Sequence, residues 1–176
     1  MDAATLAADL HALLVERGET VASAESLTGG GLADLLSSTP GASSSYVGGV
    51  VSYATSVKVK VLGVPAELVE RYGVVSEECA GAMATGARDV LGATWAVSTT
   101  GVAGPTEQEG QPVGTVFLGI AGPGGLTVSE LALDGDRDAI RAQTCLLALD
   151  QVLAVVGTSH GSARAMLPPW EPTNDF

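Results

Sequence analysis

The stretch Ser23-Ala24-Glu25-Ser26-Leu27-Thr28-Gly29-Gly30-Gly31 joins a short β-like run, residues 20–22, to a helical pattern that begins at Leu32. Ser26 is therefore predicted to lie on a tight strand-to-helix turn. The three glycines let another molecule approach the backbone closely, and a helix N-terminus offers free N–H groups and a partial positive charge. Such a turn can hold a nucleophile, an oxyanion or a phosphate. The alternative is a capping serine at a flexible helix start.

Outward from this turn, hydrophobic periodicity predicts strands that alternate with helices. The expected strands are 20–25, 47–53, 94–98, 115–121 and 127–133, the last two joined by a hairpin turn at 122–125. The expected helices are 3–17, 28–38, 55–62, 65–72, one that Ser76 caps and that runs to Leu91, and 137–156, capped by Asp136. This alternation predicts a three-layer α/β/α sandwich with a mixed sheet, in a single domain over residues 1–156. We expect residues 157–176 to form a loose tail.

Composition narrows the classes of partner. The 176 residues carry a net charge of −12 with a pI near 4.3, which disfavours nucleic acid and anionic membrane surfaces. Hydrophobic residues make up 46% but aromatic residues only 4%, so small aliphatic side chains fill the core. The N-terminus does not resemble a signal peptide and no apolar run reaches transmembrane length, so we expect a cytoplasmic protein.

The reactive side chains are few. Neither His11 nor His160 is well placed beside Ser26, which disfavours a Ser-His-Asp triad and a histidine-based metal site. The cysteines, Cys79 and Cys145, have no metal-ligand spacing and are expected to be buried apolar residues. If Ser26 is a nucleophile, its base must be a lysine, a carboxylate or a tyrosine.

Lysine occurs at only two positions, Lys58 and Lys60. Two residues apart on a helix they point in opposed directions, so at most one can face a given pocket. Lys58 follows Tyr53 at a strand exit, where ligands of open α/β sheets collect, and Lys60 is expected to be solvated. Apolar neighbours would lower the pKa of Lys58, and Tyr53 could pass a proton or hold the lysine. The alternatives are an ordinary surface lysine and a tyrosine that packs in the core.

Two further segments are candidate binding elements. The run from Thr99 to Pro105 is a second glycine-rich turn after a strand, whose backbone could reach a sugar, a phosphate or an amide. Arg137 and Arg141 lie four residues apart near the start of the last predicted helix. They could clamp a phosphate, or merely pair with the neighbouring aspartates.

These motifs occur in the order found in the CinA C-terminal domain family, which residues 5–156 resemble as a stand-alone member. The shared segments are Ala24–Gly30, Tyr53 and Lys58, Gly73–Ser76, Thr100–Pro105, Pro112–Val116 and Gly135–Arg137. Many members have an asparagine where this chain has Thr55, and a lysine where it has Gln111. The loop 106–110 also departs from the family pattern.

The resemblance implies a function. Active members are nicotinamide-nucleotide amidases, which convert nicotinamide mononucleotide and water into nicotinate mononucleotide and ammonia without metal or other cofactor. It assigns the nucleophile to Ser26 and the base to Lys58, and matches Tyr53, Thr100, and Arg137 or Arg141 to family positions. Because the family often self-associates, a homo-oligomer is expected.

The sequence thus predicts a serine–lysine amidohydrolase acting on nicotinamide mononucleotide. In this interpretation the N–H groups of Thr28, Gly29 and Gly30 stabilise the oxyanion. An arginine, Arg137 or Arg141, and the Gly101–Gly104 loop hold the phosphate and ribose. The alternatives are a non-catalytic nucleotide-binding or scaffold domain of the same fold, and another small amide or ester as substrate.

Overall fold

A computed structural model describes residues 1–159 of the chain. Its strands are β1 (Val21–Glu25), β2 (Tyr46–Val51), β3 (Trp95–Gly101), β4 (Thr115–Gly122) and β5 (Gly125–Ala132). Its α-helices are α1 (Ala3–Arg17), α2 (Gly31–Ser38), α3 (Thr55–Leu62), α4 (Ala66–Tyr72), α5 (Glu77–Leu91) and α6 (Arg137–Thr158), with a 3-10 turn η1 (Ala42–Ser44) before β2.

The strands form one mixed sheet in the order β2-β1-β3-β4-β5. The first three are parallel, and β4 and β5 add to β3 as an antiparallel hairpin. β1 is paired along both edges and all five of its residues are buried. The carboxyl ends of β1, β2 and β3 therefore meet at one edge of the sheet, where α/β proteins commonly bind ligands.

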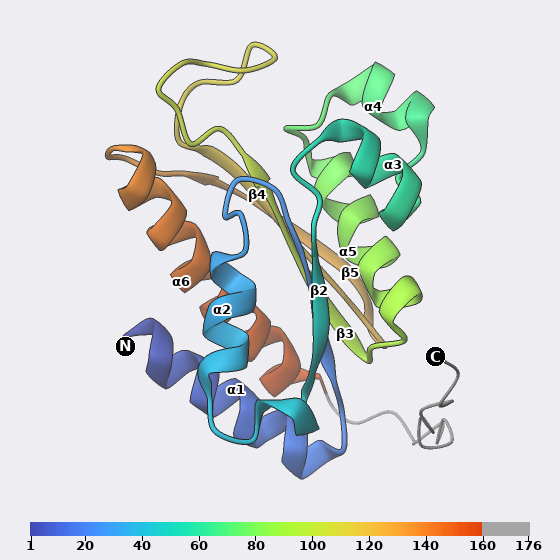
Figure 1. The fold of residues 1–176 in the computed structure, drawn as a ribbon, viewed down its shortest axis with the longest axis vertical. Coiled ribbons are helices and arrows are strands. Elements are labelled where there is room, and N and C mark those ends of the chain that lie inside the picture. The colour runs from blue at the N-terminus through green and yellow to red at the C-terminus, as the bar shows by residue number, and fades with distance from the viewer. Residues whose placement is uncertain (160–176) are drawn as a thin grey trace, which may run out of the picture.

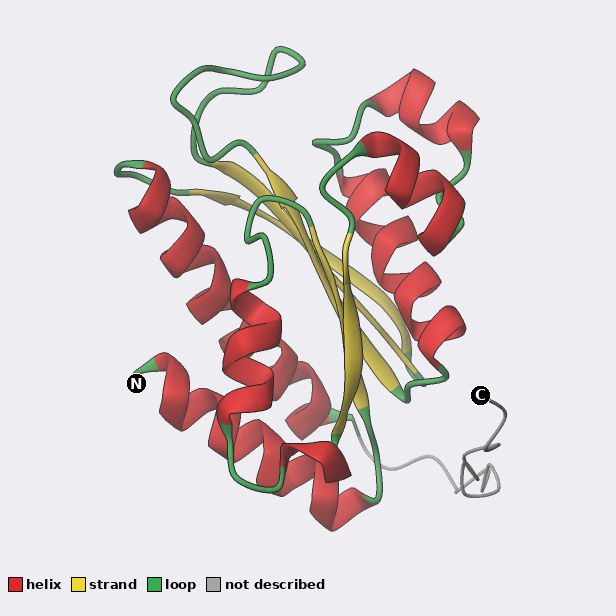
Figure 2. Cartoon of the chain, in the orientation of Figure 1, coloured by secondary structure: helices red, strands yellow, loops and turns green. Residues whose placement is uncertain are grey.

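Helices cover both faces of this sheet (Figure 1). α1, α2 and α6 lie on one face, and α3, α4 and α5 on the other, so the predicted three-layer arrangement is confirmed (Figure 2). One apolar cluster joins α1, α2 and α6 to the sheet, around residues such as Leu10 and Leu149. A second cluster lies beneath α5, around Met83 and Ala96. The chain leaves β1 toward α2 on one face and leaves β2 toward α3 on the other, and this divergence places the site between the two exits.

The predicted helix ends follow from their capping residues. Ser76 accepts a hydrogen bond from the Cys79 N–H, and Asp136 accepts one from the Ala139 N–H. Gly18 ends α1 in the left-handed conformation that glycine adopts readily.

Several element boundaries differ from the predictions, and three of them bear on the site or on the domain end. α2 begins at Gly31 rather than at residue 28, because residues 26–30 form a turn in which Gly29 and Gly30 have φ of 60° and 101°. β3 continues to Gly101 because it pairs with β4 over that length. α6 runs two residues past the predicted domain end at 156, and residues 160–176 of the predicted tail lie outside the described residues.

α6 was not expected to have the length and composition of a membrane-spanning helix, yet its 22 residues satisfy both criteria. One stripe of α6, which includes Ile140, Leu149 and Val156, is fully buried against α1 and the sheet. The helix therefore contributes one face to the core of this domain, and this packing accounts for the apolar residues of that face.

Candidate active site

Ser26 is the first residue after β1 and lies half-buried at the carboxyl edge of the sheet. Its N–H donates to the Thr99 carbonyl at 2.9 Å, which extends the β1–β3 pairing by one residue. Its hydroxyl points to Lys58. The strand thus ends in a hydroxyl whose backbone is fixed by the neighbouring strand.

Lys58 lies on α3, whose first turn follows the exit of β2, and only 1% of the residue is exposed. Its Nζ lies 2.9 Å from Ser26 Oγ, 2.6 Å from the Ser52 carbonyl and 3.4 Å from the Tyr53 carbonyl. Burial lowers the pKa of Lys58, and the electrostatic effects of Cys79 and Glu109 partly oppose that shift. Lys60 is exposed, as the helical spacing predicts.

These contacts suit a lysine that accepts a proton from Ser26. A neutral amine has two N–H donors and one lone pair. The carbonyls of Ser52 and Tyr53 can accept both donors, which leaves the lone pair for the Ser26 hydroxyl. Burial favours this neutral form.

Tyr53 contacts the lysine through its backbone and not through its ring. The side chain is 61% exposed, and its hydroxyl accepts a hydrogen bond from Arg137 Nη2 at 2.9 Å. Arg137 Nη1 also donates to the Gly104 carbonyl at 2.8 Å. Arg137 therefore connects the β2–α3 turn with the loop after β3. The expected contact between the Tyr53 hydroxyl and Lys58 is absent from the hydrogen bonds of residues 1–159.

A cleft of about 130 Å³ opens beside Ser26 and Lys58. Of the other predicted site residues it contains Tyr53, Thr100, Gly101, Gly104 and Arg137. Thr55, Val74 and Gln108 also line it, although the sequence analysis assigned them no role in the site. Thr100 donates its hydroxyl to the Val74 carbonyl at 2.6 Å, so only its oxygen lone pairs remain for a ligand.

Thr28, Gly29, Gly30 and Arg141 do not line this cleft. The Thr28 hydroxyl pairs with the Thr99 hydroxyl at 2.8 Å. Arg141 lies against the serine turn, where Nε donates to the Leu27 carbonyl at 3.1 Å and Nη2 to the Thr28 carbonyl at 2.9 Å. The two arginines of α6 thus contact different parts of the protein, and only Arg137 reaches the cleft.

The prediction that Gly29 and Gly30 donate to an oxyanion is wrong, and Glu25 is one reason. This carboxylate is fully buried and accepts hydrogen bonds from the N–H groups of Gly30, Leu32 and Ala33 at 2.8–3.1 Å. The Gly29 N–H donates to the Ser26 carbonyl. The start of α2 is therefore already occupied by the protein's own acceptors, and neither Gly29 nor Gly30 has its N–H free. A glutamate directly before the serine was the available signal for this cap.

Glu109 is a second acidic residue that the sequence did not identify as part of the site. Its carboxylate accepts the N–H groups of Val74 and Val75 at 2.8 and 3.2 Å. This contact ties the loop after β3 to the turn before α5. Because Val74 and Val75 line the cleft, Glu109 holds two of its walls together.

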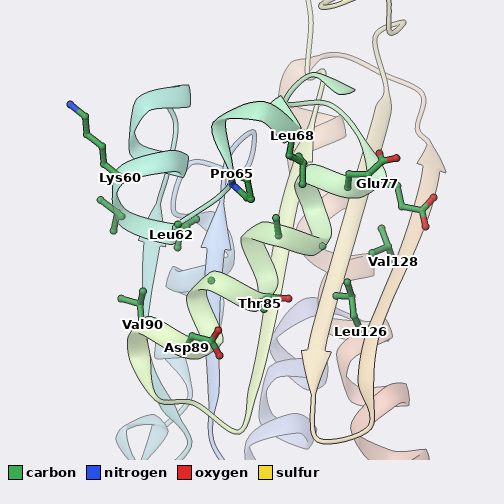
Figure 3. Close-up of a pocket in the computed structure, with 16 residues that line it drawn as sticks. Lys60, Leu62, Pro65, Leu68, Glu77, Thr85, Asp89, Val90, Leu126 and Val128 are labelled. Atoms are coloured by element: carbon green, nitrogen blue, oxygen red, sulfur yellow. The ribbon is translucent and has the colours of Figure 1, made fainter. Parts of the chain in front are cut away.

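A larger groove of about 940 Å³ lies elsewhere, between α3, α4, α5 and β5 (Figure 3). Aliphatic residues such as Leu62, Leu68 and Leu126 line it, together with the acidic Glu77 and Asp89. Ser26, Lys58 and Arg137 are not among its lining residues. By volume alone this groove would be the candidate active site. The smaller cleft is the better candidate because it contains the Ser26 hydroxyl paired with the buried Lys58 amine.

Comparison with known proteins identifies the family of this chain. Residues 3–156 match the family model of the CinA C-terminal domain. A CinA-like protein of Frankia casuarinae is 52% identical over 140 residues, 80% of this chain and 32% of that protein. One of Synechocystis is 47% identical over 157 residues, 86% of this chain and 37% of the relative. The chain spans about a third of the length of these relatives.

Solved structures extend the likeness to the whole fold. A competence damage-inducible protein A from Klebsiella pneumoniae superimposes with a TM-score of 0.88 at 30% identity, over 91% of this chain and 100% of that one. A CinA superfamily protein from Escherichia coli gives 0.85 at 32% identity, over 87% and 90%. The family match covers the serine turn, the buried lysine and Arg137 together. The chain therefore belongs to the CinA C-terminal domain family.

Proposed function

We propose that this chain is an amidohydrolase that converts nicotinamide mononucleotide and water into nicotinate mononucleotide and ammonia. The observation that carries the proposal is the buried Lys58 amine 2.9 Å from the Ser26 hydroxyl. A hydroxyl with an adjacent base of lowered pKa is the arrangement of an activated nucleophile. The carboxamide is the substrate group that such a pair would attack, and the family resemblance supplies the nucleotide.

In the acylation step, Lys58 takes the Ser26 proton while Oγ bonds to the carboxamide carbon. We place the oxyanion at the N–H groups of Leu27, which lines the cleft, and of Thr28, the next residue; no acceptor among residues 1–159 engages either group. As the tetrahedral intermediate collapses, the C–N bond breaks and the Lys58 ammonium gives its proton to the leaving nitrogen. Ammonia departs and an ester to Ser26 remains.

In the deacylation step, Lys58 is again neutral and removes a proton from a water molecule. The hydroxide attacks the ester carbon, and the Ser26 Oγ leaves and recovers its proton from Lys58. The product is the carboxylic acid, which loses its proton to solvent and leaves as the carboxylate. One lysine thus serves as base and as acid in both half-reactions.

The cleft sets how the nucleotide would lie. Its volume of about 130 Å³ is below the range of about 300–1,000 Å³ typical of pockets that enclose a whole ligand. It suits the carboxamide end, which leaves the ribose and phosphate at the mouth. Arg137 is exposed there and is the cation placed to meet a phosphate.

The test is release of ammonia from nicotinamide mononucleotide by the wild-type chain and by Ser26→Ala. We expect release by the wild type and loss of turnover by orders of magnitude in the variant, with unchanged circular dichroism. A wild-type chain that binds the nucleotide without releasing ammonia would favour the non-catalytic binding domain instead. Nicotinamide and its riboside, assayed in parallel, distinguish the nucleotide from other small amides.

A further inference from the structure

One side chain of α6, that of Arg141, forms hydrogen bonds to the turn that carries Ser26. Arg141 donates to the carbonyls of Leu27 and Thr28 through two different nitrogens. A Cβ added to Gly29 would lie 3.3 Å from Arg141 Nη2, so the guanidinium also lies close against the turn. The contact of Arg141 with Asp138 is 3.9 Å long and Asp138 is 92% exposed, so this ion pair contributes little.

These bonds fix the direction of the peptide groups. In a trans peptide the C=O and the following N–H point to opposite sides. The Leu27 carbonyl points to Arg141, so the Thr28 N–H points away from α6. The Ser26 carbonyl accepts the Gly29 N–H at 3.2 Å, which in the same way sets the direction of the Leu27 N–H.

The hydrogen bonds of the turn leave these two donors free. The N–H groups of the other residues from 26 to 33 are all engaged, by Thr99, Ser26, Glu25 and Thr28. The Leu27 and Thr28 N–H groups donate to no acceptor within the described part of the chain. Both directly follow the nucleophile, where an oxyanion formed on an attacked carbonyl would lie.

We propose that Arg141 is a positioning residue. By holding the Leu27 carbonyl, it keeps the Thr28 N–H aimed at the oxygen of the amide that Ser26 attacks. By holding the Thr28 carbonyl, it keeps the Gly29 N–H on the Ser26 carbonyl, and that bond orients the Leu27 N–H toward the same oxygen. Arg141 touches neither the substrate nor the reacting atoms, and its effect falls on the transition state rather than on nucleotide binding. This inference rests on the proposed function of the Ser26–Lys58 pair.

The test compares Arg141→Ala and Arg141→Lys with wild type, with Asp138→Asn as the matched control. The first readout is kcat and KM for nicotinamide mononucleotide. The second is the rate at which a fluorophosphonate probe modifies Ser26: Oγ bonds to phosphorus, fluoride leaves, and Lys58 takes the proton. This second rate needs no knowledge of the natural substrate.

For Arg141→Ala we expect kcat and the labelling rate to fall about 100-fold, with KM within about threefold of wild type. Arg141→Lys keeps the charge and the aliphatic stem but lacks the planar fork that reaches both carbonyls, so we expect a loss of about tenfold. Asp138→Asn should match the wild type. If the alanine variant does not fold, the lysine variant decides the result.

Labelling of folded Arg141 variants at the wild-type rate would overturn the proposal, as would a raised KM with unchanged kcat. Absence of labelling in the wild type would instead contradict the proposed nucleophile itself. A wild type that is labelled at Ser26 but leaves the nucleotide intact would contradict only the proposed substrate. In that case the labelling rates of the variants still test Arg141.

Discussion

At the scale of single residues, the two lysines of the chain occupy opposite environments within one helix. Lys58 is buried against Ser26, while Lys60 is exposed. We expect Lys58→Ala to lower kcat for amide hydrolysis by at least about 100-fold, because the serine loses its base. Lys60→Ala should stay within about twofold of wild type. Ammonia release measures both, and equal losses would show that the helix presents its lysines differently.

The lowered pKa of Lys58 gives a pH prediction. Neutral Lys58 is the active form, so kcat/KM should rise with pH through that pKa. Since Glu109 opposes the shift, Glu109→Gln should move the rising limb to lower pH. Glu107→Gln, an exposed change on the same loop, should leave it in place. A limb that moves to higher pH in Glu109→Gln would contradict the electrostatic account.

The same shift has a consequence for stability. The unfolded chain has Lys58 near its ordinary pKa of 10.5, above the folded value. Between the two values the unfolded state binds more protons, so the free energy of unfolding contributed by this group rises with pH across that window. Below the folded pKa the buried ammonium is a constant unfavourable contribution.

At the scale of elements, the start of α2 depends on Glu25. Its carboxylate accepts three N–H groups that would otherwise be unpaired. Glu25→Gln removes the charge and presents an N–H₂ group to backbone donors, so we expect the free energy of unfolding to fall by about 2–3 kcal/mol in urea titrations. Asp34→Asn, on the exposed side of α2, is the control. A loss in Glu25→Gln no larger than in the control would show that the cap is dispensable.

Arg137 joins two segments at the mouth of the cleft, and its position there predicts a preference for substrates that carry a phosphate. Arg137→Ala should raise KM for nicotinamide mononucleotide about tenfold or more, the value of a lost charged hydrogen bond. The riboside lacks the phosphate, so its kinetics should barely change. Arg141→Ala should lower kcat for both substrates alike. Equal weakening of both substrates by Arg137→Ala would mean that this arginine only joins Tyr53 to Gly104.

At the scale of the whole molecule, the site depends on how closely the layer of α3 and α5 packs. A Cβ at Gly86 on α5 would lie 1.9 Å from the Leu62 carbonyl at the end of α3. Gly86→Ala should therefore cost about 1–3 kcal/mol of stability by overpacking and reduce fluorophosphonate labelling of Ser26 by displacing Lys58. Gly157→Ala on α6 meets nothing within 4 Å and should not destabilise. A Gly86→Ala chain with wild-type melting and labelling would contradict this.

Much of the architecture follows from sequence, and the exceptions have a physical reason. The proximity of Ser26 and Lys58 could be predicted because it depends on local features, namely the strand ends and the opposed directions of the two lysines on one helix. The prediction that Gly29 and Gly30 donate to an oxyanion is wrong, because the Ser26 carbonyl accepts the Gly29 N–H and the buried Glu25 carboxylate accepts the Gly30 N–H. Arg137 and Arg141 share a helical face, yet successive turns of α6 meet different neighbours. Such assignments depend on tertiary contacts, which no local pattern contains.

β1 has pairing partners along both edges, and every residue in it is buried. Core strands in that position open at the highest free energies of a domain, so the backbone directly before Ser26 is firmly held. The opposite wall of the cleft, the loop after β3, is held by Arg137 and by the Glu109 carboxylate at its tip. Ser26 therefore keeps its position in the cleft. Any motion that admits or releases a ligand takes place in the facing loop after β3.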